Sequence, residues 1–383
     1  MNIENLHSVL PERIPAEICD QIQFFLRSNA DQQMRFVIFL SQQIDIEINR
    51  FLTLSIPPFD FPLVKARIIR NSSKDVFCIN MNHTPTDGAG LKEFVKILSS
   101  NYNHLLENQD YVGLSNINGD RSIKQVTRSF TFLQKLQFIK RGFKQPRRFP
   151  LWSFDWNKSE SDNESRFATI KISAETFTKI KAFGKNQNAT INDIILAAFI
   201  RVFVSTNPKN EKAAKPVIVP VDLRKHIKLG HNTAICSLTG SLICSIGADT
   251  GITFADTLQK VKEEMTFKKK TDAEMNMLAP FLVLSKFMSY SQLKEKTMQR
   301  KMPPIPLVTN VGIINSSDIN FNNIPVEYSY MTGAINFGAY FCMCCSTFNN
   351  EITFSIGFTG GDLQKQKISV FFDKLKTELE SIN

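Results

Sequence analysis

The sequence predicts an α/β (α+β layered) protein, and two patterns carry this prediction. Apolar runs of strand length alternate with segments whose apolar residues recur at helical spacing. Two strand-like runs that follow each other closely, at residues 337–348 and 351–358, predict an antiparallel hairpin near the end of the chain. Alternating strands and helices with late hairpins are typical of layered proteins in which helices cover sheets.

The first part of the chain alternates between the two kinds of segment. The expected elements are, in order, a helix at 16–28, a strand at 34–40, a helix at 44–54, strands at 61–69 and 76–81, and helices at 91–98 and 135–148. The strand at 76–81 is mostly apolar, so we expect it to be buried.

A polar run at 157–164, Asn-Lys-Ser-Glu-Ser-Asp-Asn-Glu, is the best linker candidate in the chain. A chain of 383 residues is long enough for two domains of ordinary size. We therefore expect an N-terminal half at residues 1–156 and a C-terminal half at residues 165–383.

The pattern restarts after this linker. Ser173 is placed to cap a helix that carries Phe177, Ile180 and Phe183. The other expected elements are strands at 166–172, 216–221 and 307–314, helices at 191–204 and 275–288, the closing hairpin, and a final helix at 363–381.

The composition is that of a globular protein, with 43% hydrophobic and 21% charged residues. The 32 Phe suit large apolar cores and an apolar tunnel. No run of about eighteen apolar residues is present, so no transmembrane segment is expected. The first residues show no basic region followed by an apolar core, so no secretory signal is visible and a cytoplasmic location is expected.

The seven Cys have no framework spacing, which favours free thiols in a reducing compartment. Cys342, Cys344 and Cys345 lie in an apolar run and are expected to be buried as small hydrophobic side chains. His226 and His231, with Asp222, lack a standard ligand spacing, so no metal site is expected.

The segment His83-Thr84-Pro85-Thr86-Asp87-Gly88 lies between the strand at 76–81 and the helix at 91–98. A neutral imidazole at the end of a strand can take a proton from an attacking hydroxyl or amine. The carboxylate is close enough to help fix the loop, and Gly88 with Gly90 relaxes the turn into the helix. The pattern fits an acyl-transfer site, and the alternative is a loop His beside a capping Asp.

This segment resembles the HxxxDG signature of the chloramphenicol acetyltransferase-like superfamily, which includes the condensation domains of nonribosomal peptide synthetases. Segments later in the chain resemble the family in the same order: 188–199 its second-domain helix, 220–225 the strand-end motif that follows, and 309–312 its Ser/Thr-Asn-x-Gly strand. The resemblance covers nearly the whole chain and is closest to freestanding condensation-domain-like acyltransferases.

The resemblance implies two chloramphenicol acetyltransferase-like halves in a V-shaped pseudo-dimer, with the active site in a tunnel at their junction. Three features depart from the family. Asn82 stands where condensation domains usually carry a second His, the plant-type Asp-Phe-Gly-Trp-Gly motif is absent, and the N-terminal half is short. A freestanding O- or N-acyltransferase is therefore a better fit than peptide-bond formation within a synthetase.

The resemblance also implies roles for the motif residues. His83 is the expected general base, and the Gly88 N–H is placed to serve the developing oxyanion. Asp87 is expected to turn away from the tunnel and to form a structural ion pair with Arg224; the alternative is that Arg224 is exposed in a turn.

Three further residues are expected to bind substrate. Asn310, with Thr309 beside it, is expected to line the tunnel or to polarise the thioester carbonyl, and Asn82 adjoins the base. The alternative for Asn310 is a polar residue that caps a strand end.

The expected reaction moves an acyl group from acyl-CoA or acyl-phosphopantetheine, each a co-substrate, to a hydroxyl or amine of a small-molecule acceptor. An acyl carrier protein is a possible partner, and no permanently bound cofactor is expected. One alternative is a catalytically degenerate protein that binds a thioester or carrier protein without turning it over.

The net charge of +10 favours anionic partners, and a basic nucleic-acid-binding protein is a further alternative. No recognised nucleic-acid motif accompanies the charge, so no nucleic acid is expected. The basic segment at 135–148, with Lys140, Arg141 and Lys144, is either a solvated helix face or a landing surface for CoA phosphates or an acidic carrier protein.

Overall fold

A computed structural model describes residues 31, 33–39, 45–59, 61–71, 74–113, 119–144, 152–156, 164–206, 214–227, 234–299, 304–337 and 340–382. The helix expected at 16–28 lies outside these residues, as do His231, most of the polar run at 157–164 and the end of the basic segment at 135–148.

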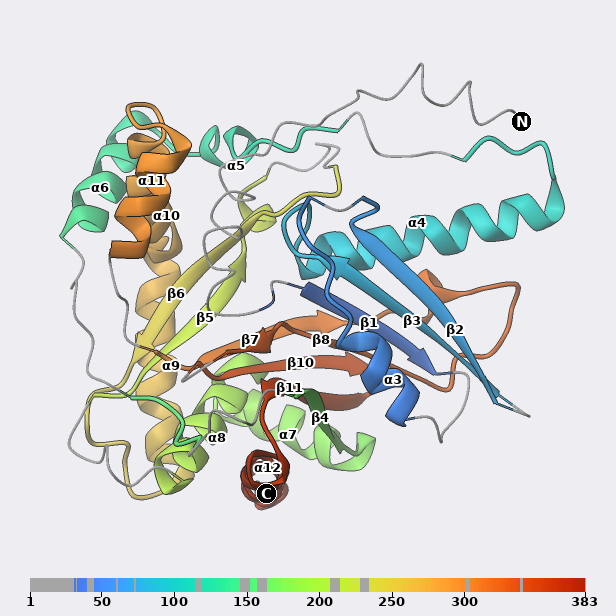
Figure 1. Cartoon of the computed structure of the whole chain (residues 1–383). Coiled ribbons are helices and arrows are strands. Elements are labelled where there is room, and N and C mark those ends of the chain that lie inside the picture. The colour runs from blue at the N-terminus through green and yellow to red at the C-terminus, as the bar shows by residue number, and fades with distance from the viewer. Residues whose placement is uncertain are drawn as a thin grey trace.

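The described residues form two sheets, shown one above the other in Figure 1. The smaller sheet has the strand order β2-β3-β1-β8, and each neighbouring pair is antiparallel. Its strands are β1 (Gln33–Phe39), β2 (Val64–Asn71), β3 (Lys74–Asn82) and β8 (Tyr328–Thr332).

The larger sheet is mixed and has the order β4-β11-β10-β7-β5-β6, with the short β9 beside β11. The closing hairpin, β10 with β11, is antiparallel as the sequence predicts, whereas β7 lies parallel to β5 and β10. The strands of the larger sheet are β4 (Ser165–Ile172), β5 (Pro216–Asp222), β6 (Thr239–Ser245), β7 (Leu307–Ile313), β9 (Ile335–Asn336), β10 (Cys342–Phe348) and β11 (Glu351–Thr359).

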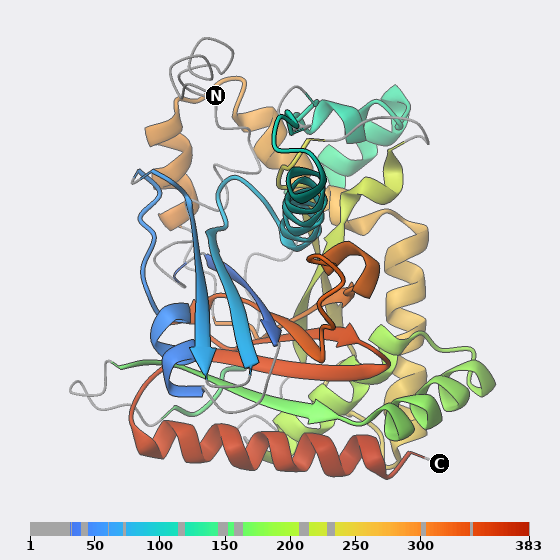
Figure 2. The ribbon, with the colours of Figure 1, turned by 90° about the vertical axis from the view of Figure 1, so that its right-hand side faces the viewer.

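Helices cover both sheets, and Figure 2 shows α12 lying along the outer side of the larger one. The described helices are α3 (Asp45–Leu52), α4 (Gly88–Glu107), α5 (Lys124–Thr127), α6 (Phe132–Phe143), α7 (Ala174–Asn186), α8 (Ile191–Thr206), α9 (Phe254–Lys270), α10 (Ala273–Leu284), α11 (Tyr290–Gln299) and α12 (Asp362–Glu380), with 3-10 turns η3 (Leu223–His226) and η4 (Ser316–Ile319).

The larger sheet packs on α8 and α12 through a core rich in aromatic rings, as the Phe content suggests. The ring centroid of Phe341 lies 5.3 Å from that of Phe203 and 5.1 Å from that of Phe371. Helix α8 is apolar nearly all round, which is why it is buried on most of its surface. This core supports the larger sheet. Its strands β5, β6 and β7 extend toward the loop at residues 83–87, the motif loop.

The smaller sheet is covered on its two faces by different helices. Leu91 and Val95 of α4 pack with Phe36 and Ile79 on one face, whereas α3 covers the other face. Alternate residues of β1 therefore enter two separate cores, as the period of two in a strand requires. The motif helix α4 is fixed along the sheet by this packing.

Contacts connect the two sheets and the parts of the chain before and after the polar run at 157–164. Strand β8 pairs with β1 in the smaller sheet, and the Met331 N–H of β8 donates to Ser346 Oγ of β10 in the larger sheet at 3.1 Å. Trp152 precedes the polar run, yet its ring lies 4.9 Å from that of Phe203 in the larger core. The division into residues 1–156 and 165–383 thus stays a prediction.

The basic segment forms a helix with other bounds than expected. Helix α6 spans Phe132–Phe143 and begins early because Thr131 and Gln134 form a capping box. Among the helices that the structure describes, none is by itself long and apolar enough to cross a membrane; α7 and α8 pass that test only together, across a bend of 105°. The six cysteines in the described ranges are free thiols.

Candidate active site

The motif loop joins the buried strand β3 to the helix α4. His83 directly follows the last residue of β3, and Gly88 is the first residue of α4. Asp87 is the N-cap: its Oδ1 accepts a hydrogen bond of 2.9 Å from the Gly90 N–H. An Asp in extended conformation satisfies one of the free N–H groups at a helix start. The loop therefore enters α4 at a fixed angle.

Asn82 holds the loop from its other end. Its side-chain amide is 2% exposed, donates to the Ile56 carbonyl at 2.8 Å and accepts from the Thr84 N–H at 2.9 Å. Substrate binding is the role that the sequence suggests for this residue. In the structure both polar ends of the amide make contacts that brace the backbone on either side of His83, and substrate binding by Asn82 stays a prediction.

His83 is half-buried, and its Nδ1 is fully buried with no hydrogen-bond partner in the described part of the chain. Burial lowers the pKa of His83, and the backbone groups of His83 and Thr86 with the Asp87 carboxylate only partly offset this. A lowered pKa keeps the imidazole neutral at pH 7. The ring is thus in the state that accepts a proton.

Asp87 is buried with several partners. Its Oδ2 accepts from Arg224 Nη1 at 2.9 Å, from the Leu238 N–H at 2.7 Å and from Thr239 Oγ1 at 3.1 Å. Burial raises the pKa of this carboxyl, but the Arg224 guanidinium and the backbone hydrogen bonds outweigh it and hold the pKa below its ordinary value. The structure therefore brings together Asp87 and Arg224, the pair that the sequence analysis expects to be joined.

Arg224 is itself fixed on three sides, so it does not sit exposed in a turn. Nη1 also donates to Asp222 Oδ1 at 3.1 Å, and Nη2 donates to the Cys236 carbonyl at 2.7 Å. Although burial alone lowers it, Asp87 raises the pKa of Arg224 above its ordinary value. This pair ties the motif loop to η3 and to the segment before β6.

Arg121 is a loop contact that the sequence analysis missed. Its guanidinium donates to the Pro85 carbonyl at 3.2 Å and also to the Ile235 carbonyl. No periodicity or motif marks Arg121, since its partners are backbone atoms far away in the sequence.

Lys92 of α4 is a second residue that was missed. Its Nζ donates to the Val311 carbonyl at 2.7 Å and to the Ile313 carbonyl at 3.3 Å. The end of β7 is thereby held against the first turns of the motif helix.

The close approach of β7 to the loop explains the glycine at the helix start. A Cβ on Gly88 would lie 3.1 Å from Val311 Cγ1, so the Val311 side chain would have to shift by a few tenths of an ångström. Asn310 donates to Asn192 Oδ1 at 2.5 Å and accepts from the Gly312 N–H at 2.8 Å. Asn310 lies in the middle of β7, so these contacts join β7 to α8 and do not cap a strand end. Substrate contact by Asn310 and Thr309 stays a prediction.

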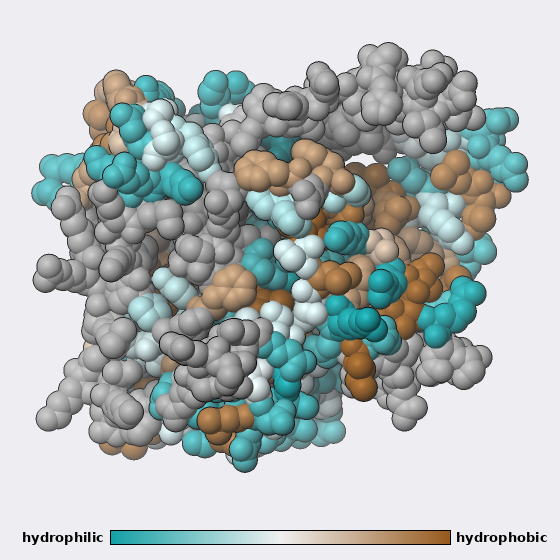
Figure 3. Space-filling model, viewed as in Figure 1, coloured by the Kyte–Doolittle hydropathy of each residue, from teal (hydrophilic) through white to brown (hydrophobic). Residues whose placement is uncertain are grey.

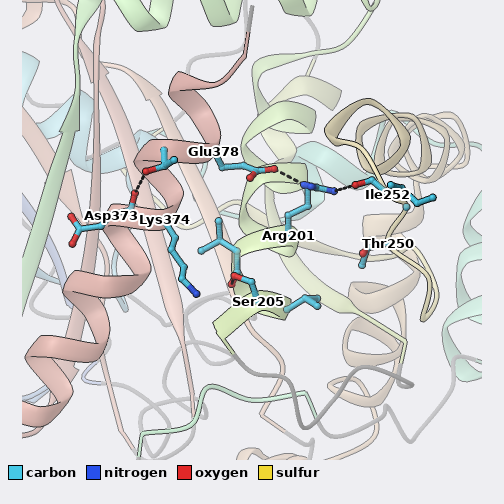
Figure 4. A pocket seen from close by; sticks show the side chains of 11 residues that line it. Arg201, Ser205, Thr250, Ile252, Asp373, Lys374 and Glu378 are labelled. Atoms are coloured by element: carbon cyan, nitrogen blue, oxygen red, sulfur yellow. Dashed lines mark hydrogen bonds and ion pairs between the residues drawn. The ribbon is translucent and has the colours of Figure 1, made fainter.

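Two of the cavities among the described residues lie elsewhere in the molecule, and neither is lined by His83. One, of about 530 Å³, lies between α8 and α12, where Arg201 pairs with Glu378 and donates to the Ile252 carbonyl at 3.3 Å (Figure 4). The other, of about 460 Å³, lies between α5, α6 and α10. The expected tunnel at His83 is not one of these two cavities.

His226 lies in an ionic cluster with Glu274, Asp272 and Lys225. Its Nε2 is 3.0 Å from Glu274 Oε1 and 4.0 Å from Asp272 Oδ1, and Lys225 Nζ pairs with the same Glu274 oxygen. Asp222 bonds Arg224 instead. Lys225 supplies one positive charge at Glu274.

Sequence comparison gives no relative: no family model matches the chain, and no curated protein sequence does. Solved structures do match. TRI3 trichothecene 15-O-acetyltransferase from Fusarium sporotrichioides aligns over 95% of this chain and 94% of its own, with a TM-score of 0.62 and 10% identity. The epimerization domain from the third module of tyrocidine synthetase B covers 95% and 87%, with a TM-score of 0.60 and 10% identity.

Polyketide synthase associated protein 5 from Mycobacterium tuberculosis is similar over 94% of this chain and 97% of its own, with a TM-score of 0.58 and 12% identity. Structural similarity at 10–12% sequence identity shows the fold of this chain. The chain has the two-lobed, mixed α/β fold of condensation and epimerization domains and of chloramphenicol acetyltransferase-like acyltransferases. The predicted fold class is confirmed.

Proposed function

We propose that this protein is an acyltransferase that moves an acyl group from a thioester to a hydroxyl or amine, with His83 as general base. The observation that carries the proposal is the contrast within the loop. His83 is buried at Nδ1, without a partner among the described residues and with a lowered pKa, while Asp87 holds the same loop through Arg224. The names of two structures of this fold, TRI3 trichothecene 15-O-acetyltransferase and PapA2 acyl transferase, support the reaction class.

In this proposal the accessible side of the His83 ring takes the proton of the acceptor as its oxygen or nitrogen attacks the thioester carbonyl. Gly88, at the N-terminus of the long helix α4, offers its N–H to the developing oxyanion, where the helix dipole also favours negative charge. Asp87 touches no reactant and positions the loop. His83 returns the proton to the leaving thiolate, so the protein ends as it began.

The proposed donor is acyl-CoA or an acyl group on a carrier protein, and the acceptor is a small molecule. No permanently bound cofactor takes part. The carrier-protein option is supported by similarity to the EpoB NRPS cyclization-docking bidomain, at a TM-score of 0.59 and 11% identity. A reducing, cytoplasmic location is part of the proposal, and free thiols suit it.

The test is thiol release from a panel of acyl-CoA esters of increasing chain length, with and without small alcohols and amines. His83→Ala is expected to lower turnover by about 10²- to 10⁴-fold, the usual contribution of a general base, with little change in Tm. His104→Ala is the matched control: His104 is exposed on α4 and bonds the Ser100 carbonyl at 2.7 Å, so its loss should leave turnover unchanged.

Equal turnover in wild type and His83→Ala would remove His83 from the mechanism. Acyl-CoA binding by the wild type with no thiol release from any ester would favour the alternative of a degenerate protein that only binds thioesters. A salt-sensitive gel shift with DNA or RNA, and no binding of thioesters, would favour the nucleic-acid alternative.

A further inference from the structure

The cavity of about 460 Å³ between α5, α6 and α10 has the character of a ligand site. Its size falls in the range of about 300–1,000 Å³ that is usual for small-molecule pockets. The wall consists mainly of apolar side chains, among them Ile123, Phe130, Phe138, Met275, Ala279 and Leu282. Five of these side chains are also part of the core that joins α6 to α10, so the walls are formed by packed helices.

The charged residues that line this cavity all have the same sign. They are Lys124, Lys135 and Lys286, and no acidic side chain is among its described lining residues. Within the described ranges, none of these lysines is in an ion pair. Lys124 and Lys286 are exposed and Lys135 is half-buried, so the ammonium groups lie toward the solvent side of an apolar space. Figure 1 places the three helices together, and Figure 3 shows hydrophilic side chains mixed with hydrophobic ones in this region.

An apolar cavity with only cations around it selects for an amphiphile with a negative head. Burying an aliphatic chain in such a cavity is favourable because it removes apolar surface from water. A carboxylate among three ammonium groups gains charge-assisted hydrogen bonds, while a cationic head would be repelled. We propose that this cavity binds a long-chain aliphatic carboxylate, with its chain between α6 and α10 and its head at Lys124, Lys135 and Lys286.

This site is separate from the motif loop, and the inference does not depend on the proposed acyl transfer. Ser122 at the edge of the cavity adjoins Arg121, whose guanidinium bonds the Pro85 carbonyl of the loop. Phe130 of the cavity wall lies 4.8 Å from the His226 ring, between ring centroids. A bound ligand would thus lie next to Arg121, which supports the loop, and next to His226, while His83 does not line the cavity.

The test is calorimetric titration of the full chain with dodecanoate, below the concentration at which it forms micelles. The variant Lys124→Gln/Lys135→Gln/Lys286→Gln is expected to weaken binding about tenfold or more. The matched control is Lys140→Gln/Arg141→Gln/Lys144→Gln, which removes the same charge from an exposed part of α6 outside the cavity and should retain wild-type affinity. Wild-type affinity should fall with salt, and that of the cavity variant should fall less.

A second variant tests the apolar part of the site. Val283→Trp fills the cavity from a half-buried wall position and should weaken both dodecanoate and the neutral dodecanol, whereas the lysine variant should weaken only dodecanoate. Absence of dodecanoate binding to the wild type would overturn the proposal. So would equal weakening by the two charge variants, or binding that occurs only to anionic lipid vesicles, which would indicate a membrane surface instead.

Discussion

His83 and Asp87 lie at the two ends of one short loop, and their surroundings are opposite. Asp87 is buried, whereas His83 is half-buried with a buried Nδ1. Asp87 accepts hydrogen bonds from Arg224, Leu238, Thr239 and Gly90, so its charge is stabilised by fixed donors. His83 has a buried Nδ1 without a partner in the described chain, and its pKa is lowered. Burial with partners fixes a charge, whereas burial without them keeps a ring neutral.

This difference separates structure from chemistry within one motif. The donors to Asp87 come from η3 and from the segment that leads into β6, so one carboxylate ties the smaller lobe to the larger one. His83 makes no such connection. The loop is therefore held through Asp87, while Nδ1 of His83, where the reaction is proposed, has no hydrogen-bond partner among the described residues.

The largest effect on stability is expected at Asp87. Asp87→Ala leaves the Arg224 guanidinium partly buried without its main counter-charge and orphans the Leu238 N–H. Breaking a buried pair in this way typically costs about 3–5 kcal/mol, so the free energy of unfolding in urea should fall by about that amount and activity should fall with it.

Asp222→Ala is the matched control, because Asp222 pairs with the same guanidinium but its side chain is 49% exposed. Its loss should cost about 1 kcal/mol or less.

Acid titration gives a second check with a definite sign. Because folding lowers the pKa of Asp87, its stabilisation is present at neutral pH and is lost as pH falls below the ordinary pKa of a carboxyl group. Wild type and Asp87→Ala should converge in stability at low pH; a constant difference would contradict the ion pair.

A smaller effect is expected at Asn82, on the other side of His83. Asn82→Ala removes a buried amide and leaves the Ile56 carbonyl unsatisfied, which should cost about 1–3 kcal/mol in urea unfolding. Asn108→Ala, at an exposed position where the side chain accepts from the Asp110 N–H, should change stability by about 0.5 kcal/mol or less. Equal effects at the two positions would show that Asn82 does not brace the loop.

The smallest effect is expected on the surface of α6. Lys140→Gln/Arg141→Gln/Lys144→Gln removes exposed charges that are proposed to attract an anionic thioester, so KM for the donor should rise a few-fold while kcat stays the same. Higher ionic strength should raise the wild-type KM more than that of the variant. An identical salt dependence of KM in both proteins would mean that this face is only solvated.

Much of the fold could be predicted because periodicity reports local structure. The strand β3, the helix α8 and the hairpin of β10 with β11 all follow from apolar spacing. Periodicity does not name the partner of a strand, so the pairing of β8 with β1 across the lobes was not foreseen. Helix α9 was missed too, because its mean hydropathy is low and Lys residues fill its last turn.

The candidate site could likewise be predicted only in part from the sequence. The resemblance of the motif placed Asp87 opposite Arg224, since a motif carries information on distant partners. The Leu238 N–H and the Pro85 carbonyl are backbone groups, whose role depends on position and not on residue type. For the same reason the inward direction of the Asn82 side chain could not be predicted from its place beside His83.

The pH dependence of kcat/KM for thioester turnover tests most directly the claim that His83 accepts the proton while Asp87 only holds the loop. Because burial lowers the pKa of His83, the ring is in its base form at neutral pH, and activity is lost only as pH falls through that lowered value. The account predicts that kcat/KM rises with the loss of one proton at a midpoint below about 6.5 and stays level above it. A midpoint at or above that value, or a rate that increases as pH falls, would contradict the account.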